Sequence, residues 1–206
     1  MSEAKPIVYL VDDNASFLHA LSCLLKLAGH RVETFASATE FLARHQPQNR
    51  GCVITDLRMP GPSGLDLQSA LMRSDNPLPV IFLTGHGDIP TSVHAMKGGA
   101  EDFLTKPVRK DDLFPAVKRA FERDAAAFEQ RARQRELRRR FELLTSRERK
   151  VLTQVVAGKL NKEIAADLGT TERTIKAHRA SIMEKMQAQS PADLGCIAHE
   201  AGLSGG

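Results

Sequence analysis

The chain has no tryptophan, a single tyrosine and only three cysteines among its 206 residues. Cys23, Cys52 and Cys196 are odd in number, far apart and set in apolar segments, so we expect reduced thiols rather than a disulfide framework. No stretch approaches the roughly 18 apolar residues of a membrane span, and the first residues lack the apolar core of a signal peptide. The sequence therefore predicts a cytoplasmic protein without a membrane partner.

Charge is distributed unevenly along the chain. From residue 126 to the end there are 15 Lys and Arg against 10 Asp and Glu, a net of +5, whereas the first 125 residues carry 14 and 15, a net of −1. Two parts with opposite charge balance suggest two tasks, the second of them on a polyanion. The length is sufficient for two domains, each with its own core.

Strand and helix signals alternate through about the first 110 residues. Five short apolar segments have the character of buried strands, and the segments between them have apolar residues at helical spacing, with Asn14 and Ser37 as helix caps. This alternation predicts a doubly wound α/β fold with a five-stranded parallel sheet. The strands are expected within residues 6–13, 31–35, 51–56, 79–85 and 101–107.

Beyond the fifth strand the pattern is helical only. One long helix is expected to begin with Asp112 as its N-cap and to run to about residue 144. Phe114, Phe121 and Phe128 recur in it every seven residues. Two interpretations fit this repeat: a short dimeric coiled coil, or phenylalanines packed on their own domain.

Six arginines between residues 131 and 140 stand against a single acid, Glu136. They suit either a solvated linker helix or a nonspecific contact with phosphates. From Thr145 onward a small all-α domain of four helices is expected, opened by the capping box of Thr145 and Glu148. Two of its helices are joined by a tight turn at Gly169, and the second is longer and basic, which is typical of a helix-turn-helix.

Polar side chains stand where the predicted strands end. Asp12 and Asp13 close the first strand, Asp56 the third, Thr84 the fourth and Lys106 the fifth. The carboxyl ends of parallel strands meet at one edge of the sheet, so these side chains should converge although they are far apart in sequence. Three carboxylates in one crevice repel one another, and an all-oxygen site of this kind suits Mg²⁺.

Three stretches carry a family resemblance: DLRMPGPSG from Asp56, LTGHG from Leu83 and EDFLTKP from Glu101. They resemble the receiver domain of bacterial response regulators, which we place at residues 1–122. The resemblance implies that Asp56 accepts a phosphoryl group from a partner sensor histidine kinase. Such a carboxylate is already an anionic nucleophile and needs no general base.

The same resemblance implies a Mg²⁺ site formed by Asp13, Asp56 and the backbone carbonyl of Arg58, with Asp12 acting through water. Arg58 and His86 flank this site and either tune dephosphorylation or are exposed loop residues. Three further positions are implied to respond to the phosphoryl group. Lys106 is implied to contact it directly, and the Thr84 hydroxyl to turn toward it. The Phe103 side chain is implied to move inward when Thr84 does.

The helix expected after Thr171 has two distinct faces. One holds apolar side chains that should pack inward: Ile175, Ile182 and Met186. The opposite face and its flank hold small and basic side chains: Arg173, Lys176, Ala177 and Ala180. Such a face suits the major groove, where alanine methyls can meet thymine methyls and a lysine can reach guanine acceptors.

The stretches LTSRERKVL, GKLNKEIAADLG and TERTIKAHRASIMEKM resemble the LuxR-type helix-turn-helix output domain, placed at residues 144–206 after a helical linker at 123–143. Receiver and output together resemble the FixJ/NarL class of transcription regulators, in particular its FixJ- and StyR-like branch. The resemblance marks three base-reading positions: Lys176, Ala177 and Ala180. Four other positions suit phosphate contacts or packing: Lys162, Arg173, Thr174 and His178.

The prediction is therefore a response regulator that is phosphorylated on Asp56 and binds promoter DNA, with RNA polymerase as a candidate partner. Homodimerisation on phosphorylation is expected through the surface around the fourth helix and fifth strand, where Gly98 and Gly99 suggest a loose helix end. The main alternative is a partner-binding receiver whose helical end has another role. An aspartyl-phosphate phosphatase is disfavoured, because Arg58 stands where a second acid is expected, and no enzyme is predicted.

Overall fold

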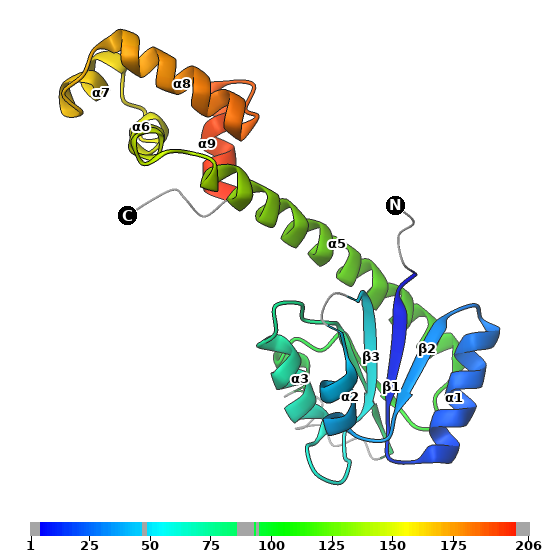
Figure 1. The fold of residues 1–206 in the computed structure, drawn as a ribbon. Coiled ribbons are helices and arrows are strands. Elements are labelled where there is room, and N and C mark those ends of the chain that lie inside the picture. Colours follow the sequence, from blue (N-terminus) through cyan, green and yellow to red (C-terminus); the bar gives the residue numbers. More distant parts are fainter. Residues whose placement is uncertain (1–4, 47–48, 86–92, 94, 201–206) are drawn as a thin grey trace. The chain divides into compact units, whose positions relative to one another are not determined.

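The computed structural model describes residues 5–46, 49–85, 93 and 95–200. The chain divides into two compact units, residues 1–128 and 129–206. Figure 1 shows their elements, and each unit is considered by itself. Within the described ranges, no helix has both the length and the apolar character needed to cross a membrane.

The first unit is built on a parallel sheet with the strand order β2-β1-β3-β4-β5. Its strands are β1 (Ile7–Val11), β2 (Arg31–Phe35), β3 (Gly51–Asp56), β4 (Val80–Thr84) and β5 (Asp102–Thr105). All pairings are parallel, which confirms the predicted five-stranded doubly wound fold. The strand order reverses between β1 and β3, and the carboxyl ends of strands at such a switch point form a natural crevice.

Helices cover both faces of this sheet (Figure 1). Residues of α1 (Ala15–Leu27) and of the first part of α5 (Lys110–Glu142) share one buried core with alternate side chains of the strands. Residues of α2 (Ala38–Arg44) and α3 (Gly64–Met72) belong to the core on the other face. The expected caps are confirmed: the side chains of Asn14 and Ser37 accept from the N–H groups of Phe17 and Glu40.

The long helix α5 begins at Lys110, so the prediction of Asp112 as its N-cap is wrong. The carbonyl of Arg109 already accepts from the N–H groups of Asp112 and Leu113, at 3.2 and 3.0 Å, which starts the helical hydrogen bonding earlier. Asp112 instead lies in the first turn, where a negative charge favours the positive end of the helix dipole.

The phenylalanine repeat of α5 packs on its own unit. Phe114 and Phe121 lie against the core beside α1, and the His30 ring is 6.5 and 5.7 Å from their ring centroids. The Arg50 guanidinium lies over the Phe128 ring at 5.2 Å. These contacts agree with the second of the two interpretations of the repeat.

Three of the six arginines in the second half of α5 form ion pairs within the second unit. Glu136 accepts from Arg139 and Arg140, which lowers its pKa to about 2. Arg133 pairs with Glu200 at 2.8 Å. These pairs reduce the charge that the run can offer to phosphates.

The second unit contains the four expected helices: α6 (Ser146–Val156), α7 (Asn161–Asp167), α8 (Glu172–Met186) and α9 (Pro191–Glu200). They enclose one core, to which Leu137 of α5 also belongs. The capping box of Thr145 and Glu148 is confirmed at the start of α6. Thr171 caps α8, and Gly169 takes a positive φ of 61° in the turn that precedes it.

Candidate functional site

Three carboxylates meet at the carboxyl edge of the sheet. One oxygen each of Asp12, Asp13 and Asp56 lies within 4.8 Å of the other two. The strand register explains this, because Val11 pairs with Thr55 and the acids follow directly after them. Asp12 is buried, Asp56 is half-buried and Asp13 is exposed, so the cluster opens to solvent on one side. An all-oxygen cluster of this spacing fits the donor set that Mg²⁺ requires.

Lys106 joins two of these acids from the end of β5. Its Nζ lies 2.6 Å from Oδ2 of Asp12 and 2.9 Å from Oδ2 of Asp56. Burial lowers the pKa of Lys106, but the hydrogen bonds with Asp12 and Asp56 outweigh that effect and leave its pKa above the usual value. The ammonium therefore stays charged at neutral pH and offsets the repulsion between the carboxylates.

Two contacts at this site were not predicted from the sequence. The Lys106 ammonium lies 4.3 Å from the centroid of the Phe17 ring, a cation–π contact. The N–H of Asn14 donates to Oδ1 of Asp12 at 2.9 Å, so that both oxygens of this buried acid are held. Asn14 is the N-cap of α1 and Phe17 lies in its first turn. The sequence indicates only that these positions start the helix, not that they contact the acidic site.

Asp56 is held by the loop that follows β3, by Lys106 and by the start of α3. The N–H of Arg58 lies 3.4 Å from its Oδ1, and Lys106 holds the other oxygen. The backbone of Gly64 approaches so closely that a Cβ there would lie 2.4 Å from the Asp56 carbonyl oxygen. Glycine at the first position of α3 is therefore required for the packing of this helix against β3.

The two expected switch residues lie on neighbouring strands. Thr84 is 4% exposed, and its backbone carbonyl accepts from the N–H of Lys106 at 2.7 Å. Phe103 is half-buried beside Phe82, with 6.2 Å between the ring centroids. His86 and the stretch that follows it lie outside the described residues.

In the second unit, α7 and α8 form the predicted helix-turn-helix. Ile175, Ile182 and Met186 are buried, as expected from their spacing. The outer face of α8 is exposed at Arg173, Lys176, Ala177 and Ala180, and Lys162 of α7 is exposed as well. His178 is half-buried, and the Thr174 hydroxyl lies 2.9 Å from that of Thr171, within the helix cap.

A buried acid fixes α8 against α6. Glu148 accepts from Ser181 at 2.7 Å and from Lys185 at 2.7 and 2.9 Å, besides its capping bond with the N–H of Thr145. Burial alone would raise the pKa of Glu148, but the bonds with Lys185, Ser181 and Thr145 lower it to about 2. The sequence indicated only the capping role, because the partners on α8 are more than 30 residues away.

Comparisons with known proteins identify a family for each of the two units. Residues 8–118 match the response regulator receiver domain, and residues 142–198 match the bacterial regulatory proteins of the luxR family. Nodulation protein W of Bradyrhizobium diazoefficiens is 43% identical over 203 residues, covering 98% of this chain and 89% of that protein. The transcriptional regulatory protein FixJ of Azorhizobium caulinodans is 41% identical over 204 residues, covering 99% and 96%.

Among solved structures, the response regulator StyR aligns with a TM-score of 0.84 and 42% identity, covering 96% of this chain and all of that one. The two family matches lie at the acidic crevice and at the helix-turn-helix, and the similarity extends over nearly the whole chain. The family to which these matches belong consists of transcriptional response regulators and is not an enzyme class. The chain belongs to the two-component response regulators that join a receiver domain to a LuxR-type DNA-binding domain.

Proposed function

We propose that a partner sensor histidine kinase phosphorylates Asp56 and that this modification controls sequence-specific binding of promoter DNA by α8. The observation that carries the proposal is the position of Lys106, whose ammonium bridges Asp12 and Asp56 at 2.6 and 2.9 Å. A cation held beside a half-buried carboxylate is suited to neutralise the oxygens of an incoming phosphoryl group.

The residues of the crevice divide this chemistry among them. Mg²⁺, when bound by Asp13, Asp56 and the carbonyl of Arg58 with Asp12 acting through water, would neutralise charge on the phosphoryl oxygens. An oxygen of Asp56 forms the new bond to phosphorus as the bond from phosphorus to the donor histidine nitrogen breaks. Lys106 then contacts the transferred group instead of the free carboxylate.

The phosphorylated state is read by Thr84 and Phe103. New phosphoryl oxygens are strong acceptors that favour a hydroxyl turned toward them. Thr84 stands on β4 beside Asp56, since Leu83 pairs with Asp56 in the strand register. Inward movement of Phe103 would change the surface of β5 and promote homodimerisation there, with RNA polymerase as a further candidate partner of the bound dimer in the cytoplasm.

At the DNA end, Lys176, Ala177 and Ala180 are proposed to contact bases. Their exposure on one face of α8 supports this role, because the other face is fully engaged in the core. Lys162 and Arg173 are proposed to contact phosphates. Thr174 and His178 are proposed to lie at the edge of the DNA interface. Thr174 also takes part in the cap of α8, and His178 is half-buried.

The phosphorylation half of the proposal is tested by intact mass after incubation with acetyl phosphate and Mg²⁺. The unmodified sequence should gain one phosphoryl group, and Asp56→Asn should gain none. Stoichiometric labelling of Asp56→Asn would overturn the assignment of Asp56 as the acceptor.

The DNA half is tested by comparing Lys176→Ala with Lys118→Ala, which removes the same charge from an exposed site in the first unit. Lys176→Ala should weaken binding to a selected site by about 1–3 kcal/mol while leaving binding to random DNA nearly unchanged. Equal losses on both kinds of DNA would identify Lys176 as a phosphate contact.

A further inference from the structure

The turn that leads into β5 is closed by hydrogen bonds. Gly99 has a φ of +85°, and its N–H donates to the Met96 carbonyl at 3.0 Å. The N–H of Ala100 donates to the Ala95 carbonyl at 3.1 Å, which completes a Schellman motif. The pair of glycines is therefore an ordered helix end, and the expectation of a loose end at this surface is wrong.

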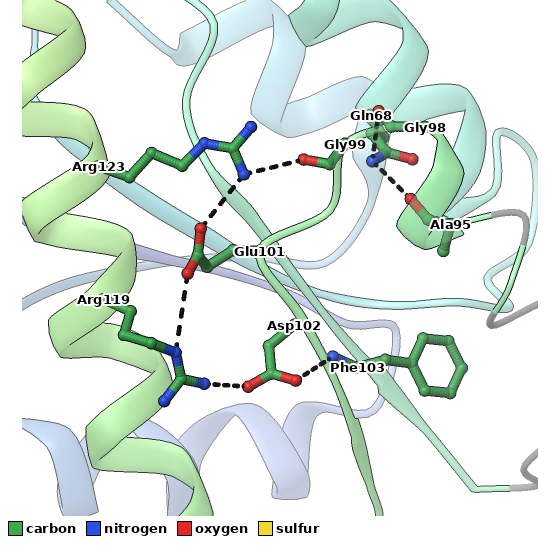
Figure 2. A network of polar contacts seen from close by, with 9 residues as sticks. All are labelled: Gln68, Ala95, Gly98, Gly99, Glu101, Asp102, Phe103, Arg119 and Arg123. Carbon is green, nitrogen blue, oxygen red and sulfur yellow. Dashed lines mark hydrogen bonds and ion pairs between the residues drawn. The ribbon is translucent and has the colours of Figure 1, made fainter.

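Two side chains hold this turn from either side (Figure 2). Gln68 of α3 is buried, and its Nε2 donates to the carbonyls of Ala95 and Gly98 at 3.2 and 3.0 Å. From the side of α5, Arg123 donates to the carbonyl of Gly99 at 3.3 Å. The segment that precedes β5 is thus tied to two helices on opposite faces of the sheet.

A second set of contacts continues from this turn along β5 (Figure 2). Glu101 pairs with Arg123 at 3.2 Å and with Arg119 at 3.8 Å. Arg119 also binds Oδ2 of Asp102, while Oδ1 of the same carboxylate accepts from the N–H of Phe103 at 2.8 Å. Asp102 therefore connects a guanidinium on α5 to the backbone of the aromatic residue on β5.

We propose that Arg119 is a positioning residue for Phe103, acting through Asp102 to hold the aromatic side chain in its half-buried, resting place. The role of Phe103 as a switch rests on the function proposed above; the positioning itself rests on the contacts. Phe103 is not fully enclosed by the core, so its position depends on how its backbone is held. A carboxylate that accepts from a backbone N–H and from a guanidinium is a directional link.

The anchor of this link is rigid. The residues of α5 around Arg119 that face the sheet have no exposed surface: Leu113, Ala116, Val117 and Ala120. Arg119 itself is half exposed, so its ion pairs add little to the stability of the fold. The contact is better suited to setting the equilibrium of a neighbouring group than to stabilising the unit.

Hydrogen exchange at the Phe103 amide tests the link in a chain that keeps Phe103. Arg119→Ala should speed this exchange about tenfold, as expected if Asp102 is released and the Phe103 N–H loses its bond with that carboxylate, and Arg119→Lys should restore part of the protection. Arg123→Ala is the matched control, because this arginine of the same helix contacts Glu101 but not Asp102. Unchanged exchange in Arg119→Ala, or equal acceleration in both alanine variants, would overturn the proposal.

The consequence for switching is measured with Phe103→Trp, since the introduced indole would be the only one in the chain. Adding Arg119→Ala should move its resting emission at least half of the way to the value that acetyl phosphate and Mg²⁺ produce. A charge exchange, Asp102→Arg with Arg119→Asp, should behave like Arg119→Ala, because arginine cannot accept from the Phe103 N–H. Rescue by that exchange would show that the ion pair alone matters and would overturn the proposal.

The two hypotheses fail separately in these experiments. If acetyl phosphate leaves the Phe103→Trp emission unchanged but Arg119→Ala still accelerates exchange at Phe103, the positioning role stands and the switch function fails. If the emission responds to phosphorylation but neither readout responds to Arg119→Ala, the switch function stands and the positioning role is overturned.

Discussion

Glu148 shows how one residue can serve local structure and tertiary structure together. Its carboxylate closes the capping box of α6 and receives a lysine and a serine from α8. A charge that is 4% exposed requires such compensation, because an unpaired buried carboxylate is costly. The position of the helix proposed to bind DNA therefore depends on an acid that itself faces away from DNA.

Replacing Glu148 with glutamine should lower the free energy of unfolding of the second unit by about 1–3 kcal/mol, because Lys185 loses its partner. The change is measured by urea unfolding followed by far-ultraviolet circular dichroism. Glu142→Gln, at an exposed position, is the control and should have little effect. Tyr9 lies in the first unit, so its fluorescence should show the same unfolding midpoint of that unit in the unmodified chain and in both variants.

The stabilisation by Glu148 should also depend on pH. Its folded-state pKa, about 2, lies below the ordinary value of 4.5. The unfolded chain therefore binds the proton more readily, so the stabilisation is fully present above about pH 4.5 and is lost as the pH falls toward 2. The stability difference between the unmodified chain and Glu148→Gln should shrink over this range; a difference independent of pH would contradict the assignment.

Gly64 lies where no side chain has room. Since a Cβ would lie 2.4 Å from the Asp56 carbonyl oxygen, Gly64→Ala should displace the phosphoryl acceptor and slow its labelling by acetyl phosphate about tenfold. Gly195→Ala is the control, because a Cβ there meets no atom within 4 Å and alanine favours the interior of α9. Equal labelling rates in the two variants would mean that the contact does not position Asp56.

At the scale of single elements, α5 makes polar contacts with two different strands. Near the amino end of β3, its Asp124 is 1% exposed and accepts from the N–H of Gly51 and the Nε of Arg50, at 3.1 and 3.3 Å. Further toward its start, Arg119 contacts β5, so polar side chains on two sides of this helix tie it to two strands. The ion pairs with β5 and the contact with β3 fix the part of the helix between Arg119 and Asp124 against the sheet.

Asp124→Ala should therefore destabilise the first unit by about 2–4 kcal/mol, since it leaves a buried N–H and a half-buried guanidinium without this acceptor. Urea unfolding followed by Tyr9 fluorescence measures the change. Glu122→Ala, an exposed acid on the same helix, should cost less than about 0.5 kcal/mol. Because alanine favours the helix at both positions, a comparable loss in both variants would show that the contact with Gly51 is not the cause.

The elements that were predicted correctly are those whose signals are local. Short apolar segments between helical segments predicted the strands. Asn14, Ser37 and Thr145 were correctly expected to cap helices, because a cap depends only on the next few residues. The start of α5 was wrong, since several acids near it could serve as a cap and only backbone geometry decides among them. The contacts of Asp124 and Arg119 were not foreseen, because their partners lie 17 to 74 residues away.

At the scale of the whole molecule, two compact units support two different chemistries. The acidic cluster could be predicted from the sequence because parallel strands bring their carboxyl ends together whatever lies between them. The inward and outward faces of α8 were predicted from helical periodicity. The polar network of β5 and α5 could not be, since ion pairs between side chains of different elements leave no periodic pattern.

The central claim is that phosphorylation of Asp56 controls DNA binding. The direct measurement is the affinity for sites selected from genomic DNA, determined on one preparation before and after incubation with acetyl phosphate and Mg²⁺, at fixed salt. The unmodified chain should bind at least about tenfold more tightly after phosphorylation, as expected if two chains bind as a dimer, and Asp56→Asn should not change. An equal gain for Asp56→Asn, or no gain for a fully phosphorylated chain, would contradict the claim.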